Sequence, residues 1–359
     1  MDKYVPGIGI SAGIWMLKWD QISQQLEMSD LKLKEGDKIN VFINFESILR
    51  NLSWNKDLNK KVQFFKQDVV LELESAILNL IAHYKAFFKK EKCKAKLYFY
   101  YTDILAEDQQ MKVYDKYYRQ YYRNRYLTNP QFRSMGLLLS EIIIPEVKLI
   151  LSYVKDCYFL CSRGYDSSVI PLAISNTSNR KNVIITGDVF DTLYLFNPNF
   201  ITIYIKRRFQ HFSVISDINS AVQSIVKNEN PFDLTIFNSE MYYRLLLSIK
   251  GSKIRNIRSA KGFGYGKFIK LLKDGIDRNI VLRDFSSLDS IIQLFPDNYA
   301  GAIKKAFQCT SIDTQYALLS NTDIEEIQTQ IVDKVDIESL EALNNKRFLE
   351  YPINLQSLI

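Results

Sequence analysis

Histidine and cysteine are scarce in this sequence of 359 residues, which contains two histidines and four cysteines. No two of the cysteines form the Cys-x-x-Cys pair that is typical of a structural zinc site. We therefore expect no zinc centre, and we interpret Cys93, Cys157, Cys161 and Cys309 as buried or half-buried free thiols. Free thiols fit a reducing compartment better than secretion, so the prediction is a cytoplasmic protein, or a virion protein if a phage encodes it.

Long hydrophobic runs are also lacking. No stretch reaches the roughly 18 consecutive apolar residues that a membrane span requires. The first residues contain no continuous apolar run before a cleavage site, so no signal peptide is expected. Hydrophobic residues make up 47% and charged residues 24% of the chain, which is the balance of a folded soluble protein without a membrane partner.

Acidic residues are in slight deficit, with 40 Asp and Glu against 47 Lys and Arg, so the formal net charge is +7. A positive field of this size favours a polyanionic partner without identifying one. The abundance of Asn, Lys and Ile, together with 22 Tyr and 22 Phe, is typical of an AT-rich coding genome and suggests a viral or phage source.

Four short runs rich in β-branched and aromatic residues predict buried strands, at 38–45, 95–101, 182–186 and 200–205. Segments with helical spacing, notably 69–88 and 137–153, separate them. This alternation predicts an α/β fold with a mostly parallel central sheet. Ligands gather at the carboxyl ends of such strands. The polar residues expected there are Asn44, Glu46, Thr102, Asp103, Asp188 and Asp191.

The change of pattern along the chain predicts four parts. We expect an N-terminal extension over 1–37 and an α/β core over 38–235, with an arch around 104–135. A helix–hairpin–helix subdomain is predicted over 236–289, followed by a helical C-terminal extension over 290–359.

The segment 250–272 carries the argument for a nucleic-acid partner. Gly262, Gly264 and Gly266 alternate with Phe263 and Tyr265, so the backbone can turn tightly while two aromatic side chains anchor it. A helix is expected to begin there, and its first N–H groups make an anion site suited to phosphate. The surrounding cations are Lys253, Arg255, Arg258, Lys261, Lys267 and Lys270. The alternative is a plain glycine-rich turn on a basic, solvated surface.

This segment resembles the helix–hairpin–helix motif of the 5′ nuclease superfamily, which comprises the flap endonucleases and the phage 5′→3′ exonucleases. In register with that motif are Gly251, Asn256, Ile257, Gly262, Phe263, Gly264, Lys267, Leu271 and Leu272. Five weaker similarities follow the family's order, at Asn44, at Asp103, at 117–125, and at the two segments 164–173 and 184–193. The resemblance implies a PIN-like 5′-nuclease fold with a helical arch, and a hairpin that grips duplex DNA phosphates, often with a bound K⁺.

The resemblance also implies metal ligands and catalytic acids. Asp103, Asp166 and Asp188 match acidic positions, and Glu46 and Asp191 are further candidates. Asp191 lies one residue after its family position, a shift that can turn its carboxylate away from the site. Other ligand positions hold residues that are poor metal ligands or none, namely Asn44, Gly164, Ser167, Phe190, Ser252 and Arg255. Cleavage by this mechanism needs two Mg²⁺ or Mn²⁺ ions, so we expect one ion at most and weak or no activity. The alternative is that Asp166 caps a helix and Asp188 shapes a turn.

Aromatic and cationic residues interleave over 117–125, where the family carries its arch. Arg119, Arg123 and Arg125 are expected to hold phosphates of a single strand while tyrosines stack on its bases. The alternative is an amphipathic helix with half-buried tyrosines.

Three functions remain open from the sequence. The first is a catalytically degenerate protein that binds DNA ends, flaps or single-strand/duplex junctions in replication, recombination or packaging, with a replication or virion protein as a further partner. The second is an active Mg²⁺-dependent 5′→3′ exonuclease or flap endonuclease. The third is a structural or virion protein that reuses the fold.

Overall fold

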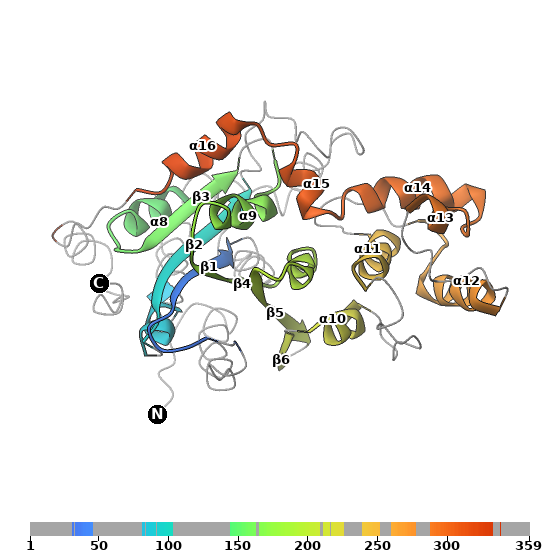
Figure 1. Cartoon of the computed structure of the whole chain (residues 1–359), viewed down its shortest axis with the longest axis horizontal. Helices are drawn as coiled ribbons and strands as arrows, with labels where there is room; N and C mark the ends of the chain where they lie inside the picture. Colours follow the sequence, from blue (N-terminus) through green and yellow to red (C-terminus); the bar gives the residue numbers. More distant parts are fainter. Residues whose placement is uncertain are drawn as a thin grey trace, which may run out of the picture.

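The computed structural model describes residues 31, 33–45, 81–82, 84–90, 92–102, 144–162, 165–208, 211–215, 217–225, 239–251, 260–277, 288–332 and 338. In this part of the chain a twisted sheet occupies one end and a group of helices the other (Figure 1). The predicted helix over 69–88 is described only from residue 81, and the arch region around 104–135 lies outside the described residues.

The sheet has six strands in the order β3-β2-β1-β4-β5-β6. Their bounds are β1 Lys38–Asn44, β2 Lys94–Thr102, β3 Cys157–Ser162, β4 Lys181–Thr186, β5 Phe200–Arg208 and β6 His211–Ile215. β1 to β5 are parallel, and β6 pairs antiparallel with β5. The prediction of a mostly parallel α/β sheet is confirmed. Two strands, β3 and β6, were missed.

Helices follow or connect the strands. Their bounds are α8 Ile144–Leu151, η2 Ser167–Val169, α9 Ile170–Ser175, η3 Asp191–Phe196, α10 Ile218–Ile225, α11 Ser239–Lys250, α12 Tyr265–Asp277, α13 Leu288–Ile292, α14 Asp297–Gln308, α15 Ile312–Tyr316 and α16 Asn321–Thr329. Within the described ranges, none of these helices is long and apolar enough to cross a membrane.

Aromatic side chains cover both faces of the central strands. Phe42, Tyr98 and Tyr158 lie in one row across β1, β2 and β3, and their rings stack at 5.2 and 5.0 Å between centroids. Beyond the end of β1, the Phe45 ring meets Phe159 edge-on at 4.8 Å. Burial on both faces is what a central parallel sheet requires. It holds the strand ends in fixed positions.

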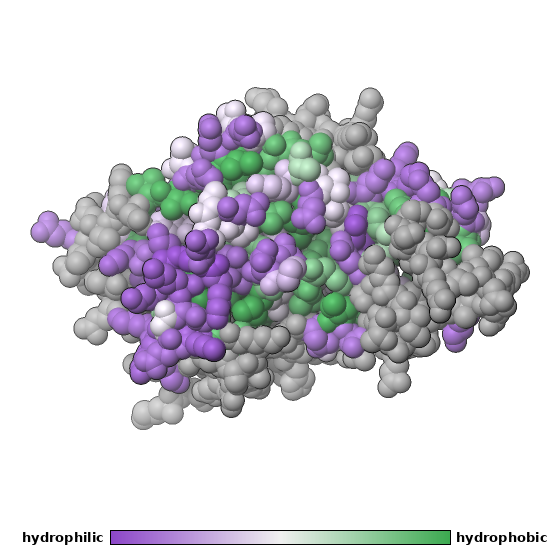
Figure 2. Space-filling model, viewed as in Figure 1, coloured by the Kyte–Doolittle hydropathy of each residue, from purple (hydrophilic) through white to green (hydrophobic). Residues whose placement is uncertain are grey.

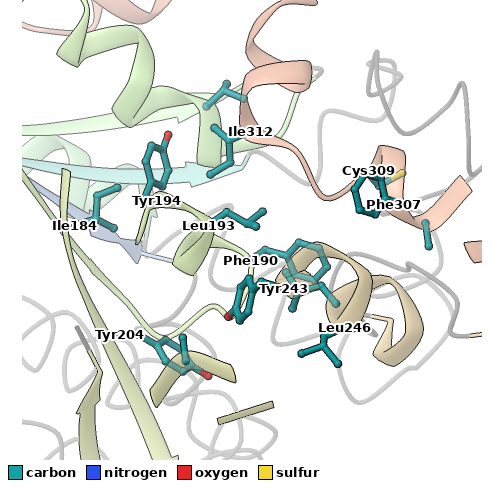
Figure 3. Packing of buried hydrophobic residues seen from close by; sticks show 14 of the residues in the cluster. Ile184, Phe190, Leu193, Tyr194, Tyr204, Tyr243, Leu246, Phe307, Cys309 and Ile312 are labelled. Carbon is teal, nitrogen blue, oxygen red and sulfur yellow. The ribbon is translucent and has the colours of Figure 1, made fainter. Parts of the chain in front are cut away.

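The same hydrophobic core continues from the sheet into the helices. Phe190 and Leu193, before and within η3, lie between Ile184 of β4 and Tyr243 of α11 (Figure 3). The cluster reaches Phe307 near the end of α14. The packing therefore fixes the α11–α14 helices against the end of the sheet at which η3 lies.

The free edge of β3 is closed by one side chain. Gln330 caps the C-terminus of α16, its Oε1 accepts the Cys161 N–H at 2.8 Å, and its Nε2 donates to the Cys161 carbonyl at 3.1 Å. A side-chain amide thus makes the two bonds that a neighbouring strand would make. Covering an edge in this way discourages pairing with another chain.

We predict that Gln330→Leu lowers the free energy of unfolding by about 1–3 kcal/mol, because a part-buried N–H and carbonyl lose their partners. Urea unfolding followed by circular dichroism measures the change. Gln328→Leu, in the same helical turn, is the matched control. Equal losses in the two variants would show that the edge contact does not stabilise the fold.

Candidate active site and nucleic-acid surface

The carboxyl ends of three neighbouring strands meet at one carboxylate. Asn44 pairs in register with Tyr100, and Thr186 lies one residue beyond the pair of Ile185 with Ile43, so Asn44, Tyr100 and Thr186 form a row. All three donate to Oδ2 of Asp191, with distances of 2.8 Å from the Tyr100 hydroxyl and 2.8 Å from Thr186 Oγ1. The Asp191 side chain is fully buried.

The three donors are neutral groups. Burial raises the pKa of Tyr100 well above its usual value, and the Asp191 carboxylate raises it further. The same two causes raise the pKa of Tyr194. Tyr100 therefore keeps its proton at physiological pH and acts as a hydrogen-bond donor. The expected rotation of Asp191 away from the strand ends does not occur, since its carboxylate reaches β1, β2 and β4.

Asp166 and Asp188 bond to their own chain neighbours. Asp166 is the N-cap of η2, and its Oδ1 accepts from the N–H and the hydroxyl of Ser168 at 2.9 and 2.5 Å. Asp188 Oδ1 accepts from the Phe190 N–H at 3.0 Å, while its own N–H donates to Thr186 at 2.9 Å. Asp166 thus caps a helix and Asp188 shapes a turn, while a catalytic role of either acid stays a prediction.

A divalent metal centre needs several carboxylate or water oxygens directed at one point. Oδ2 of Asp191 already accepts three hydrogen bonds, and Oδ1 of both Asp166 and Asp188 is bound by nearby donors. Among the described residues, no group of three His, Cys, Asp or Glu side chains is positioned to hold a metal ion. The loss of the two-metal centre therefore stays a prediction. Glu46 and Asp103 lie outside the described residues.

Sequence reasoning missed two members of this cluster, Tyr100 and Thr186. Each lies near the end of a strand and is buried, so each was interpreted only as part of a strand. The signal that identifies them is their register with Asn44, which becomes visible once the order of the strands is known.

The α11–α12 connection is described from residue 260 onward, and α11 itself packs against η3. The Tyr243 hydroxyl of α11 bonds to Thr192 Oγ1, and its ring lies 5.6 Å from that of Phe196. Phe263 is buried, with its ring 5.2 Å from Phe295 and 5.1 Å from Tyr299, so it anchors the connection as expected.

The glycines of this connection differ in role. Gly262 has φ +82°, the left-handed conformation that favours glycine. Gly264 and Gly266 are not left-handed, and Gly266 lies inside α12 because that helix begins at Tyr265. Gly251, directly after α11, is also left-handed with φ +68°. The prediction for Gly266 is corrected from loop to first helical turn.

The basic residues predicted here are Lys261, Lys267 and Lys270, and all three are exposed. Lys267 Nζ donates to the Gly262 carbonyl at 2.7 Å and lies 5.9 Å from the centre of the Tyr299 ring. The expected K⁺ stays a prediction, because residues 252–259 of the segment lie outside the described residues.

The remaining predicted DNA-binding residues lie outside the described part of the chain. They are Arg119, Arg123 and Arg125 of the expected arch and Lys253, Arg255 and Arg258 of the hairpin. The four cysteines are free, with Cys93, Cys157 and Cys309 buried and Cys161 half-buried, which confirms their prediction.

No family model matches the chain, and no curated protein matches it. Among solved structures, the flap endonuclease of bacteriophage T5 matches with a TM-score of 0.51, over 82% of this chain and 98% of that one. The chain has the fold of a flap endonuclease.

The two sequences are 10% identical, so the likeness concerns the fold alone. That structure is a pseudo-enzyme–product complex with DNA and metal ions. The fold-level part of the resemblance, an α/β nuclease-type sheet with helices, is confirmed.

Proposed function

We propose that this chain is a catalytically degenerate protein of 5′-nuclease-like fold that binds DNA ends, flaps or single-strand/duplex junctions. Its setting in this proposal is phage or viral DNA replication, recombination or packaging. The α11–α12 helix–hairpin–helix segment and the arch provide the DNA contacts, and a replication or virion protein is the further partner.

One observation carries the proposal of degeneracy. In place of a carboxylate open to metal at the strand ends, Asp191 is fully buried and accepts from Asn44, Tyr100 and Thr186. Hydrogen bonds donated to a carboxylate stabilise its charged form. This environment supports a structural role for Asp191, and with it a loss of metal-dependent hydrolysis.

The start of α12 supports the DNA contact. Lys261, Gly262, Gly264 and Lys270 are exposed around a helix N-terminus, where the first N–H groups of a helix attract anions. Contacts of this kind bind the phosphate backbone and not the base sequence, so they should weaken steeply with salt.

The prediction is that the protein binds 5′-flap DNA in Mg²⁺ or Mn²⁺ without cutting it. Lys261→Glu/Lys270→Glu should weaken this binding by about tenfold or more at low salt, because two cations are replaced by anions. Fluorescence anisotropy of a labelled flap measures the affinity. Denaturing gels of the same samples measure cleavage.

Lys148→Glu/Lys305→Glu is the matched control, since it makes the same change of charge at exposed positions of α8 and α14. It should bind as the wild type does. Unchanged affinity in the α12 variant would remove this surface from the proposal. A metal-dependent product that disappears in Asp166→Asn/Asp188→Asn would show that the protein is an active nuclease.

A further inference from the structure

A basic groove of about 490 Å³ lies at the amino-terminal edge of the sheet. Among the described residues that line it, six are cations and Asp156 is the one acid. The cations are Lys85, Lys89, Lys92, Lys94, Lys155 and Arg180. Figure 2 shows hydrophilic residues gathered at the lower left, over the side where Figure 1 draws the starts of β1 and β2.

The position of the groove follows from the parallel topology. Lys94 begins β2, Lys155 precedes β3 by two residues, and Arg180 immediately precedes β4. In a parallel sheet the strands all start on the same side, so these residues lie together at the amino-terminal ends of the strands. The Asp191 cluster lies at the carboxyl ends, so the groove and the candidate active site are at opposite edges of the sheet.

Two cations of the groove are held in place by backbone carbonyls. Arg180 Nη1 donates to the carbonyls of Lys94 at 2.9 Å and Ile39 at 3.3 Å. The guanidinium has three further N–H donors, on Nε and Nη2, which form the edge that binds phosphate in a bidentate manner. Lys85 Nζ donates to the Lys155 carbonyl at 3.2 Å.

The positive charge of the groove is only partly neutralised. Lys92 pairs with Glu35 at 2.9 Å in an exposed ion pair. Within the described ranges, no acid forms an ion pair with Lys89, Lys94 or Lys155. Burial lowers the pKa of Lys85. Cys157 and Asp156 act to raise this pKa, whereas the nearby charges of Lys89 and Lys155 lower it further. An anion entering the groove would relieve this repulsion.

We propose that this groove binds the phosphates of a nucleic-acid strand, as a second site separate from the α12 surface. The inference rests on the proposed DNA-binding function and extends it to two DNA segments held at opposite edges of one sheet.

The lining favours backbone phosphates over bases. None of the described lining residues has an aromatic ring on which a base could stack, and the apolar ones are the small or aliphatic residues Cys93, Ala95 and Leu97. Several cations from different elements suit a chain of phosphates, and the arginine edge selects phosphate by shape as well as by charge. An acidic peptide carries the same sign of charge, so the test includes one as a competitor.

The test is a titration of a short labelled single-stranded oligonucleotide at protein concentrations well above the dissociation constant. We expect two oligonucleotides per wild-type chain, one for Lys89→Glu/Lys155→Glu, one for Lys261→Glu/Lys270→Glu, and none for the combined variant. Lys89→Gln/Lys155→Gln should weaken the groove in the same direction, and Lys148→Glu/Lys305→Glu should leave two sites. Circular dichroism verifies that each variant is folded.

The outcomes separate the two proposals. Loss of all binding in the α12 variant would overturn the groove and leave the proposed function intact. If the groove variant lost all binding and the α12 variant kept all of it, the result would support the groove and overturn the α12 surface. A nucleoside triphosphate that displaces the oligonucleotide from the groove at equal or lower concentration would overturn the strand as the ligand, and equal displacement by polyglutamate would overturn phosphate altogether.

Discussion

Replacing Asp191 by alanine is expected to lower the free energy of unfolding by about 3–5 kcal/mol. The substitution leaves the Asn44 amide, the Tyr100 hydroxyl and the Thr186 hydroxyl without their common acceptor in a fully buried place. Each unsatisfied buried donor costs about 1–3 kcal/mol, and the removal of a buried charge offsets part of the total. Urea unfolding in EDTA, followed by tyrosine fluorescence and circular dichroism, measures the loss.

Asp274→Ala, at an exposed position of α12, is the matched control and should change stability by less than about 0.5 kcal/mol. Asp191→Asn should fall between wild type and Asp191→Ala, because it keeps one acceptor oxygen. If Asp191 were a metal ligand, its replacement should instead raise the stability in EDTA, since acids gathered for a cation repel one another when the cation is absent. If Asp191→Ala were more stable than wild type in EDTA, and Mg²⁺ stabilised only the wild type, the structural role would be wrong.

Under the proposed function, the Asp191 cluster would let a nuclease-type sheet keep its shape without metal. In a two-metal site the cations compensate the charge of the acids. Here Asn44 supplies a donor at the end of β1, where the family resemblance implies an acid, and two hydroxyls donate to the same carboxylate. Hydrogen bonds to the charged form of a carboxylate stabilise that form.

The strands were predictable because their signal is local. The runs over 38–45 and 182–186 are rich in buried β-branched or aromatic residues, and the structure places β1 and β4 there. β3 was missed although its aromatic and aliphatic residues are similar to those of β2, which was predicted. Its identity as a strand depends on parallel pairing with β2, which is a property of the folded chain.

The candidate site was predictable only in outline. Polar residues after strands identified Asn44, Asp188 and Asp191, but the direction of the Asp191 carboxylate depends on how η3 turns after β4. Sequence spacing does not contain this information.

The basic groove was not predictable from the sequence at all. Its cations come from segments around Lys89, Lys155 and Arg180, and in each segment the charges look like ordinary solvated surface. Parallel strand order brings the three segments to one edge. The hairpin cations, by contrast, were recognisable because they are contiguous in sequence.

Alkaline pH is expected to unfold this protein steeply, beginning between about pH 9 and 10. Burial raises the pKa of Tyr84, Tyr100, Tyr194 and Tyr243 above their usual value, and all four side chains are almost fully buried. Burial also raises the pKa of Cys157 to about 12. The unfolded chain releases these protons at lower pH than the folded chain, so the unfolded state binds fewer protons and stability falls as pH rises.

Each such group contributes a slope of about 1.4 kcal/mol per pH unit, so the four tyrosines together give up to about 5 kcal/mol per pH unit above pH 10. Urea unfolding at a series of pH values measures the slope. Tyr84→Phe should reduce it by about 1.4 kcal/mol per pH unit, because one titrating group is removed from a buried site. Phe88→Leu, a neighbouring buried substitution without a titrating group, should lower stability equally at every pH. A stability that stays constant to about pH 11 would mean that these hydroxyls ionise as freely in the folded chain as in water, which their burial forbids.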